Sequence, residues 1–134
     1  MEVAPASCGD KRTWASETST AVMPGSWSNR TVGSGADLTA TIKRVLSNDT
    51  SSNNAAYFAT SCNAGGFADW FLGSVGEMKL LNDNLQGLSG LFATNYWTST
   101  ENLSANAYFV GLSNNSISNN TKSNLFNVIP IRSF

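Results

Sequence analysis

Carboxylates are the side chains of this 134-residue chain that could do acid–base chemistry, because the sequence contains no histidine. Asp69 and Glu77 lie in one glycine- and aromatic-rich stretch, and a pair of carboxylates can supply a general acid and a general base. Glu77, however, stands three residues after Ser74, which is the spacing of a capping box at a helix start. We therefore interpret both carboxylates as structural and predict that the protein is not an enzyme and has no catalytic residues.

The two cysteines, Cys8 and Cys62, offer little metal or covalent chemistry. Two thiolates alone do not complete a zinc site, so we expect no metal and no cofactor. A Cys8–Cys62 disulfide would stabilise the fold by about 4 kcal/mol in the chain-entropy model and would indicate an oxidising compartment. Two buried free thiols fit the sequence equally well.

The composition predicts a neutral, polar surface. Only 13% of the residues are charged and the net charge is −1, whereas the chain holds 16 Asn, 19 Ser and 12 Thr. Such a surface has no basic field to attract nucleic acid. No apolar run reaches the roughly 18 residues that membrane insertion needs, and no signal peptide is recognisable at the N-terminus. We expect a virion protein or an extracellular, surface-displayed domain.

Two helices are predicted in the first two thirds of the chain. The first covers residues 36–47, and Ser34 with Asp37 resembles a capping box at its start. Its apolar residues recur at helical spacing: Leu38, Ile42, Val45 and Leu46. The second helix begins after Ser74 and is expected to end at Gly87. Residues 1–35 look extended and turn-rich, and residues 55–62 are ambiguous between helix and strand.

From Tyr96 onward the apolar period changes to two, which predicts strands over residues 96–101, 107–112 and 125–132. Asn- and Ser-rich segments, such as residues 113–123, are expected to be loops. The fold class is therefore α+β: one domain over residues 1–134, with two helices packed on a small antiparallel sheet and long polar loops.

Several blocks of the chain, taken in order, resemble the Lcl C-terminal-domain family, a bacterial and phage branch of the C-type-lectin-like fold. One block follows Gly65-Gly66 and matches the family at Asp69, Trp70, Leu72, Ser74, Glu77 and Met78. The others are Val3 to Ala6, Val32 to Ala36, Tyr96 to Glu101, Ala107 to Asn114, and Val128 to Phe134. Gly73 replaces a proline of the family pattern, and Ile129 replaces an arginine.

This resemblance implies a C-type-lectin-like fold in which the first and last strands pair and a loop-rich ligand region lies above the sheet. The calcium-bridged sugar site of calcium-dependent lectins has no counterpart, because the chain has no Glu-Pro-Asn or Trp-Asn-Asp sequence. A relationship to the formylglycine-generating enzymes of the same fold is not expected, because Cys8 and Cys62 lie outside the late strands.

The predicted ligand-binding region is the set of polar segments between residues 101 and 127. Its candidate residues combine amides with one carboxylate and one phenol: Glu101, Asn102, Asn106, Tyr108, Asn114, Asn115, Asn119 and Asn120. Amides both donate and accept hydrogen bonds, which suits a neutral ligand such as a glycan, although Asn is also a common loop former. Glu101 could instead pair with Arg132.

The tryptophans divide into two pairs. Trp70 and Trp97 have apolar neighbours and are expected in the core. Trp14 and Trp27 could be exposed platforms that stack on sugar rings, but we favour packing under a long loop.

The function predicted from these features is recognition of a glycan or a surface protein by a non-enzymatic adhesion module. The alternative is a structural virion component, such as a capsid decoration or fibre-associated protein, whose partners are neighbouring subunits. A start at Met1 without a signal peptide favours the virion setting. A homo-oligomer is compatible with both functions.

Overall fold

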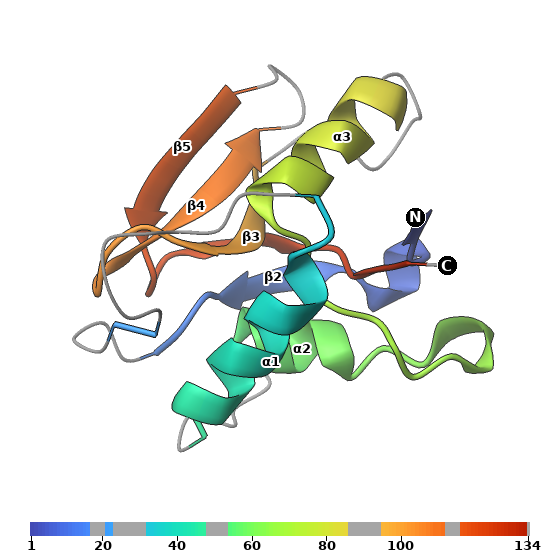
Figure 1. Cartoon of the computed structure of the whole chain (residues 1–134), viewed down its shortest axis with the longest axis horizontal. Coiled ribbons are helices and arrows are strands. Elements are labelled where there is room, and N and C mark those ends of the chain that lie inside the picture. The colour runs from blue at the N-terminus through green and yellow to red at the C-terminus, as the bar shows by residue number, and fades with distance from the viewer. Residues whose placement is uncertain (17–20, 23–31, 48–53, 86–94, 112–115, 134) are drawn as a thin grey trace.

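The computed structural model describes residues 1–16, 21–22, 32–47, 54–85, 95–111 and 116–133 (Figure 1). This part of the chain is α+β. Its helices are α1 (Gly35–Val45), α2 (Ala55–Thr60) and α3 (Val75–Leu85), with 3₁₀ turns at Ala6–Cys8 and Ala64–Gly66. Its strands are β1 (Glu2–Val3), β2 (Asp10–Thr13), β3 (Asn95–Glu101), β4 (Asn106–Gly111), β5 (Ser116–Thr121), β6 (Leu125–Val128) and β7 (Ile131–Arg132). None of these helices is long and apolar enough to cross a membrane.

Five of the strands form one sheet in the order β2-β6-β3-β4-β5, and β1 pairs with β7 in a separate ribbon that brings the two termini together (Figure 1). The pairing of β1 with β7 matches the arrangement that the family resemblance implied. The five-stranded sheet is mixed, because β3 and β6 run parallel. The prediction of a purely antiparallel sheet with two helices is therefore wrong in both respects for the described residues.

Core side chains cover both faces of the sheet. Trp97 packs in one buried cluster with Ile42 and Ala56 of α1 and α2, whereas its neighbour Tyr96 belongs to a second cluster with Met78 of α3. Neighbouring residues of a strand point to opposite faces, so the two clusters lie on opposite sides of β3. Trp97 and Trp70 are buried as predicted.

The predicted capping box at α3 is confirmed. The Ser74 backbone N–H donates to Glu77 Oε1 at 2.9 Å, and the Glu77 N–H donates to Ser74 Oγ at 3.3 Å. The same carboxylate reaches the segment before α1, where its Oε2 accepts from the Gly33 N–H at 3.2 Å. At Gly35 a Cβ would collide with Glu77 Oε1 and lie 3.0 Å from the Ser74 backbone nitrogen, so this helix start favours glycine. The buried Glu77 carboxylate therefore accepts hydrogen bonds from backbone N–H groups just before both α1 and α3.

The structure also bears on the predicted start of the first helix and on the ambiguous segment from residue 55. The Ser34 side chain makes no capping hydrogen bond at α1, so the predicted Ser34/Asp37 box is wrong. The ambiguous segment from residue 55 is helical, because the Asn54 side chain accepts from the N–H groups of Ala56 and Tyr57. The predicted end of the second helix at Gly87 lies outside the described residues.

Two strand predictions need correction. The predicted loop over residues 113–123 contains β5, which pairs along its whole length with β4. The predicted strand over residues 125–132 is divided at Ile129 and Pro130 into β6 and β7, which belong to different sheets. Proline cannot donate to a ladder, so it marks the point where the chain leaves one sheet for the other.

The alternative that the sequence left open for the cysteines is resolved. Cys8 and Cys62 form a disulfide with their Cα atoms 5.7 Å apart. It joins the turn before β2 to the segment after α2, and these segments are 54 residues apart in sequence.

Candidate functional site: an amide patch on the β4–β5 hairpin

The β4–β5 hairpin brings four of the predicted ligand-binding residues together. Its antiparallel register places Asn106 opposite Thr121 and Tyr108 opposite Asn119. Side chains directly opposite one another share a face, and residues two apart on a strand do so too. Asn106, Tyr108 and Asn119 therefore project from the same face of the hairpin.

Two hydrogen bonds connect these side chains. Asn106 Nδ2 donates to Asn119 Oδ1 at 3.1 Å, and the Tyr108 hydroxyl donates to Asn102 Oδ1 at 3.3 Å. We call Asn102, Asn106, Tyr108 and Asn119 the amide patch. Asn119 is exposed and the other three are half-buried. Each amide has two donor hydrogens and an acceptor oxygen with two lone pairs, so these contacts use only part of what the patch can offer a ligand.

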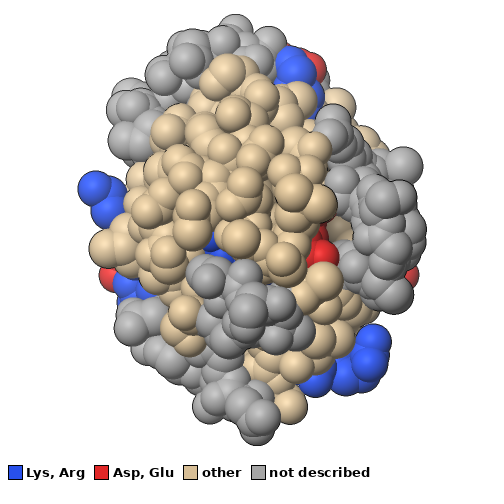
Figure 2. Space-filling view, turned by 90° about the vertical axis from the view of Figure 1, so that its left-hand side faces the viewer, with Lys and Arg blue, Asp and Glu red and all other residues tan. Residues whose placement is uncertain are grey.

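The surface around the amide patch carries little charge. The strands β4 and β5 contain no Asp, Glu, Lys or Arg. Figure 2 views the side of the molecule on which β5 lies; the described surface there is mostly uncharged, with lysine and arginine atoms mainly near its margins and a few acidic and basic atoms closer to its centre. A ligand at this surface would be held by short-range hydrogen bonds and stacking on Tyr108 rather than by charge.

The remaining predicted amides do not join the patch. Asn120 follows Asn119 on β5, so its side chain projects from the face opposite the amide patch. Its Oδ1 accepts from the Thr121 N–H at 2.7 Å and from Asn124 Nδ2 at 2.6 Å, so it fastens the turn after β5. Asn114 and Asn115 lie outside the described residues.

Glu101, which was also predicted to bind the ligand, does not join the amide patch. Its side chain is buried and forms an ion pair with Lys122 Nζ at 2.5 Å, rather than with Arg132. Its Oε2 also accepts from the Val22 N–H at 2.7 Å. Two charges that are removed from water need such partners, because an unpaired buried charge is strongly destabilising.

Lys122 lies beneath the hairpin and connects it to the N-terminal segment. Its ammonium group is 4.5 Å from the centre of the Trp14 ring, and its backbone oxygen accepts from the Trp14 N–H at 2.8 Å. Trp14 is fully buried and donates from Nε1 to the Thr98 oxygen at 2.7 Å. Trp14 is thus a packing residue, as favoured, and not a sugar platform; Trp27 lies outside the described residues.

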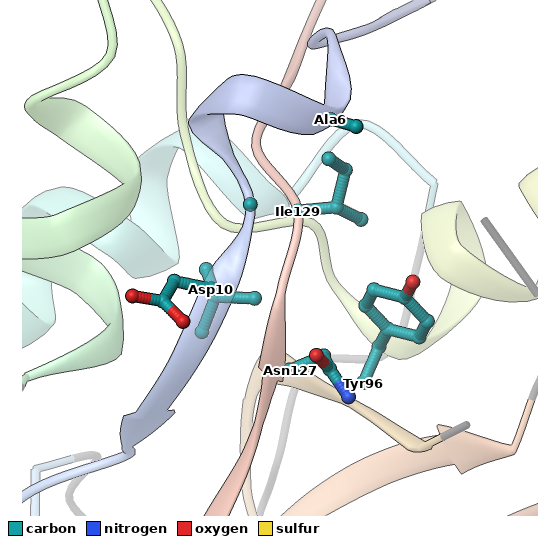
Figure 3. Close-up of a pocket in the computed structure, with 7 residues that line it drawn as sticks. Ala6, Asp10, Tyr96, Asn127 and Ile129 are labelled. Carbon is teal, nitrogen blue, oxygen red and sulfur yellow. The ribbon is translucent and has the colours of Figure 1, made fainter. Parts of the chain in front are cut away.

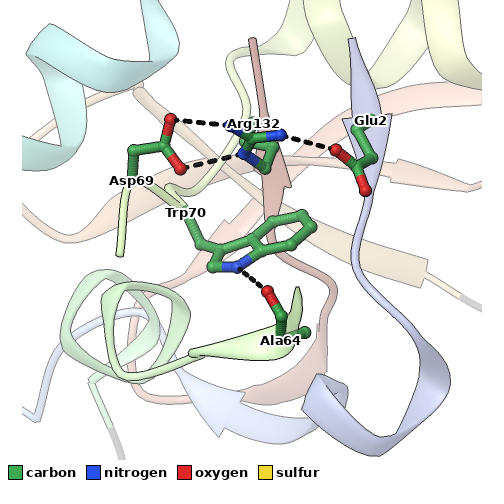
Figure 4. A network of polar contacts seen from close by, with 5 residues as sticks. All are labelled: Glu2, Ala64, Asp69, Trp70 and Arg132. Atoms are coloured by element: carbon green, nitrogen blue, oxygen red, sulfur yellow. Dashed lines mark hydrogen bonds and ion pairs between the residues drawn. The ribbon is translucent and has the colours of Figure 1, made fainter. Parts of the chain in front are cut away.

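Arg132 holds the two ends of the chain against the segment before α3 (Figure 4). It donates to Asp69 Oδ1 from Nε at 2.9 Å and to Glu2 Oε2 from Nη1 at 2.7 Å. Its guanidinium also stacks 3.6 Å from the centre of the Phe67 ring. The hydrogen bond from Arg132 lowers the pKa of Asp69 below its ordinary value. Asp69 is therefore a charged structural residue and a poor general base at neutral pH.

A small hollow of about 150 Å³ lies beside β2, β3 and β6 (Figure 3). Its lining includes Asp10, Tyr96 and Asn127. The Asp10 carboxylate is turned away from Tyr96 and Asn127 in Figure 3, and it accepts from Arg12 Nη1 at 2.6 Å. This hydrogen bond lowers the pKa of Asp10. At about 30 Å³ per water molecule the hollow has room for a few waters, and its carboxylate is already engaged.

The described residues contain no group of three or more His, Cys, Asp and Glu side chains that could hold a metal ion. The polar networks around Glu77, Glu101 and Arg132 join segments of the chain. Within the described part of the molecule, we take the amide patch as the candidate site for a neutral ligand.

The buried pair beneath the hairpin was missed by sequence reasoning. The chain has only eight lysines and arginines, so a lysine directly after the polar strand β5 was a weak signal that it has a specific partner. Nothing in the local sequence indicates that this partner is Glu101.

No family model matches the sequence, and no curated protein matches it. Among solved structures, a fimbrial protein from Bacteroides ovatus is similar, with a TM-score of 0.61 and 13% sequence identity. The match covers 91% of this chain and 33% of the other chain, so this chain spans about a third of that protein's length. At such low identity the similarity shows a shared fold and no more.

Proposed function

We propose that the chain is a non-enzymatic recognition module, displayed on the surface of a cell or a virion, that binds a glycan or a surface protein through the amide patch. The observation that carries the proposal is the juxtaposition of Asn106, Asn119 and Tyr108 on one uncharged face of a paired hairpin. Binding groups are often presented in this way by a rigid scaffold.

The disulfide supports a location outside the reducing cytosol, because such bonds persist in oxidising compartments. The fold similarity to a fimbrial protein agrees with surface display. The proposal includes a relationship to the Lcl C-terminal-domain family, supported by the family-like blocks and by the pairing of β1 with β7.

A structural role in a fibre or virion is the second candidate. It is favoured by the same fimbrial neighbour, whose chain is about three times the length matched here. In that case the hairpin would contact neighbouring subunits, and the free domain would bind no glycan.

A glycan array and a cell-binding assay with the purified protein test the proposal. We expect binding by the wild-type protein and at least a tenfold loss, about 1.4 kcal/mol, in the variant Asn106→Ala/Asn119→Ala. Asn63→Ala is the matched control, because Asn63 is an exposed amide that follows the disulfide and its side chain makes no capping bond. An unchanged melting temperature would show that the patch variant remains folded.

Two results would reject the recognition role. One is equal binding by the patch variant and the control. The other is an absence of binding by the free domain together with its stoichiometric incorporation into particles, which would favour the structural role.

A further inference from the structure

We propose that β5 is a self-association edge that pairs in antiparallel fashion with β5 of a second copy of this chain. In the described sheet β5 is a terminal strand, paired on one side with β4. An edge strand presents backbone N–H and C=O groups that can bind another strand. This inference goes beyond the proposed function and does not depend on glycan binding.

The direction of the backbone groups follows from the ladder. Lys122 N–H donates to the Ala105 oxygen at 2.8 Å, which continues the β4–β5 register by one residue pair. Pairs in an antiparallel ladder alternate between hydrogen-bonded and non-hydrogen-bonded. Ser118 and Asn120 therefore direct their backbone groups towards β4, whereas Ile117, Asn119 and Thr121 direct theirs outward.

The open part of this edge is short and well defined. At Thr121 the outward N–H already donates to Asn120 Oδ1, and the oxygen accepts from the Asn124 N–H at 3.0 Å. The open stretch within the described strand therefore centres on Ile117 to Asn119. The Ile117, Ser118 and Asn119 side chains are exposed, and Ile117 retains 40% of its accessible surface.

This stretch is complementary to itself. With the two-fold axis at Ser118, Ile117 of one copy lies opposite Asn119 of the other, and the outward groups of both residues meet as a hydrogen-bonded pair. Ser118 then faces its own counterpart, where two hydroxyl groups fit without repulsion. No charged residue lies on β5, so no like charges oppose the contact.

We infer that a second copy of the chain binds this edge, because in this register β5 pairs with its own sequence. Ile117 also packs across the axis next to Asn119 of the other copy, which covers an apolar side chain that is otherwise exposed. Ile117 projects from the same face as the amide patch, so in the joined sheet Ile117 of the second copy lies beside Asn119 of the patch. Asn106 and Tyr108 lie on β4, one strand away from the axis.

Sedimentation equilibrium over a concentration series tests this pairing with the full chain. We expect a reversible dimer, and at least tenfold weaker association for Ser118→Lys, because two ammonium groups would meet at the axis. Ser123→Lys is the control of equal charge, since Ser123 is exposed in the turn beyond the edge. A monomer up to about 1 mM, or a dimer that Ser118→Lys leaves intact, would overturn the proposal.

Hydrogen exchange on the wild-type protein gives a test that needs no variant. Raising the concentration should slow exchange at the Ile117 and Asn119 amides and leave those of Ser118 and Asn120 unchanged, because the latter already bind β4. Protection that appears only on adding a different protein would assign the edge to another partner and reject self-pairing. Asn106→Ala should leave self-association unchanged, because Asn106 lies on β4, one strand away from the axis, which separates this test from that of the proposed function.

Discussion

The two edges of the five-stranded sheet are built differently. β2 carries Asp10, Lys11 and Arg12 in four residues, whereas the six residues of β5 carry no charge. β2 is also covered in part, because the Arg12 guanidinium stacks 4.2 Å from the centre of the Phe58 ring of α2. Charges and a covering helix are common means by which proteins block unwanted strand pairing.

This difference shows where the chain uses its few charges. With only 13% charged residues, it places three of them on one edge strand and none on the other. The uncharged edge is the one proposed above to pair with a second copy.

The largest change in the free energy of unfolding is expected when the buried Lys122–Glu101 ion pair beneath β5 is broken. Lys122→Met leaves Glu101 as a buried, unpaired carboxylate and is expected to lower the free energy of unfolding by about 3–5 kcal/mol. Lys11→Met, on the exposed part of β2, should change it by less than about 0.5 kcal/mol. Denaturant titration of both variants measures the contrast, which equal losses would contradict.

The disulfide is expected to act on the β2 side. Replacing Cys8 and Cys62 by serine should cost about 4 kcal/mol in the chain-entropy model, measured by chemical denaturation. The bond precedes β2 directly, so hydrogen exchange should accelerate more at β2 than at β5. An acceleration at β5 as large as that at β2 would show that the two edges do not unfold separately.

Loss of the helix cap at Ser74 is expected to lower the free energy of unfolding by an intermediate amount. Ser74→Ala removes the hydroxyl that accepts from Glu77 N–H and should cost about 1 kcal/mol in a denaturant titration. Because α3 packs in the core, exchange at β2 and β5 should increase to the same extent. No change in stability would show that Ser74 contributes little to the capping box.

The smallest effect concerns the charge of β2. The hydrogen bond from Arg12 lowers the pKa of Asp10 below its ordinary value, so the Asp10 charge is lost only as the pH falls through the lowered pKa. An NMR titration should place its midpoint below that of an ordinary aspartate, and Arg12→Gln should raise it. Self-association through β5 should not follow this titration, since β5 has no ionisable side chain.

The sequence predicted those features that depend on local spacing. The Ser74/Glu77 box lies within four residues and was correct, as were the α+β class and the burial of Trp70 and Trp97. The relevant hydrogen bonds and apolar periods are contained in short windows, where spacing determines which groups can meet.

Features that depend on distant partners were not predictable in the same way. β5 has polar residues on both faces because it is an edge strand, so no apolar alternation distinguishes it from a loop. The burial of Glu101 was not predicted, because its partners Lys122 and Val22 come from other parts of the chain. Within the amide patch, Asn106 and Asn119 were chosen by residue type, and only the β4–β5 register shows that they meet.

The ion pair under the hairpin has a consequence for the environments that the protein tolerates. Dissolved ions screen the exposed pairs of Arg12 with Asp10 and of Lys79 with Asp83, but they do not reach the buried Lys122–Glu101 pair. The amide patch itself has no charge to screen. The hairpin is therefore expected to keep its shape from fresh water to sea water, and binding through the proposed amide patch should depend little on salt over a range in which a charge-based adhesive surface would lose most of its affinity.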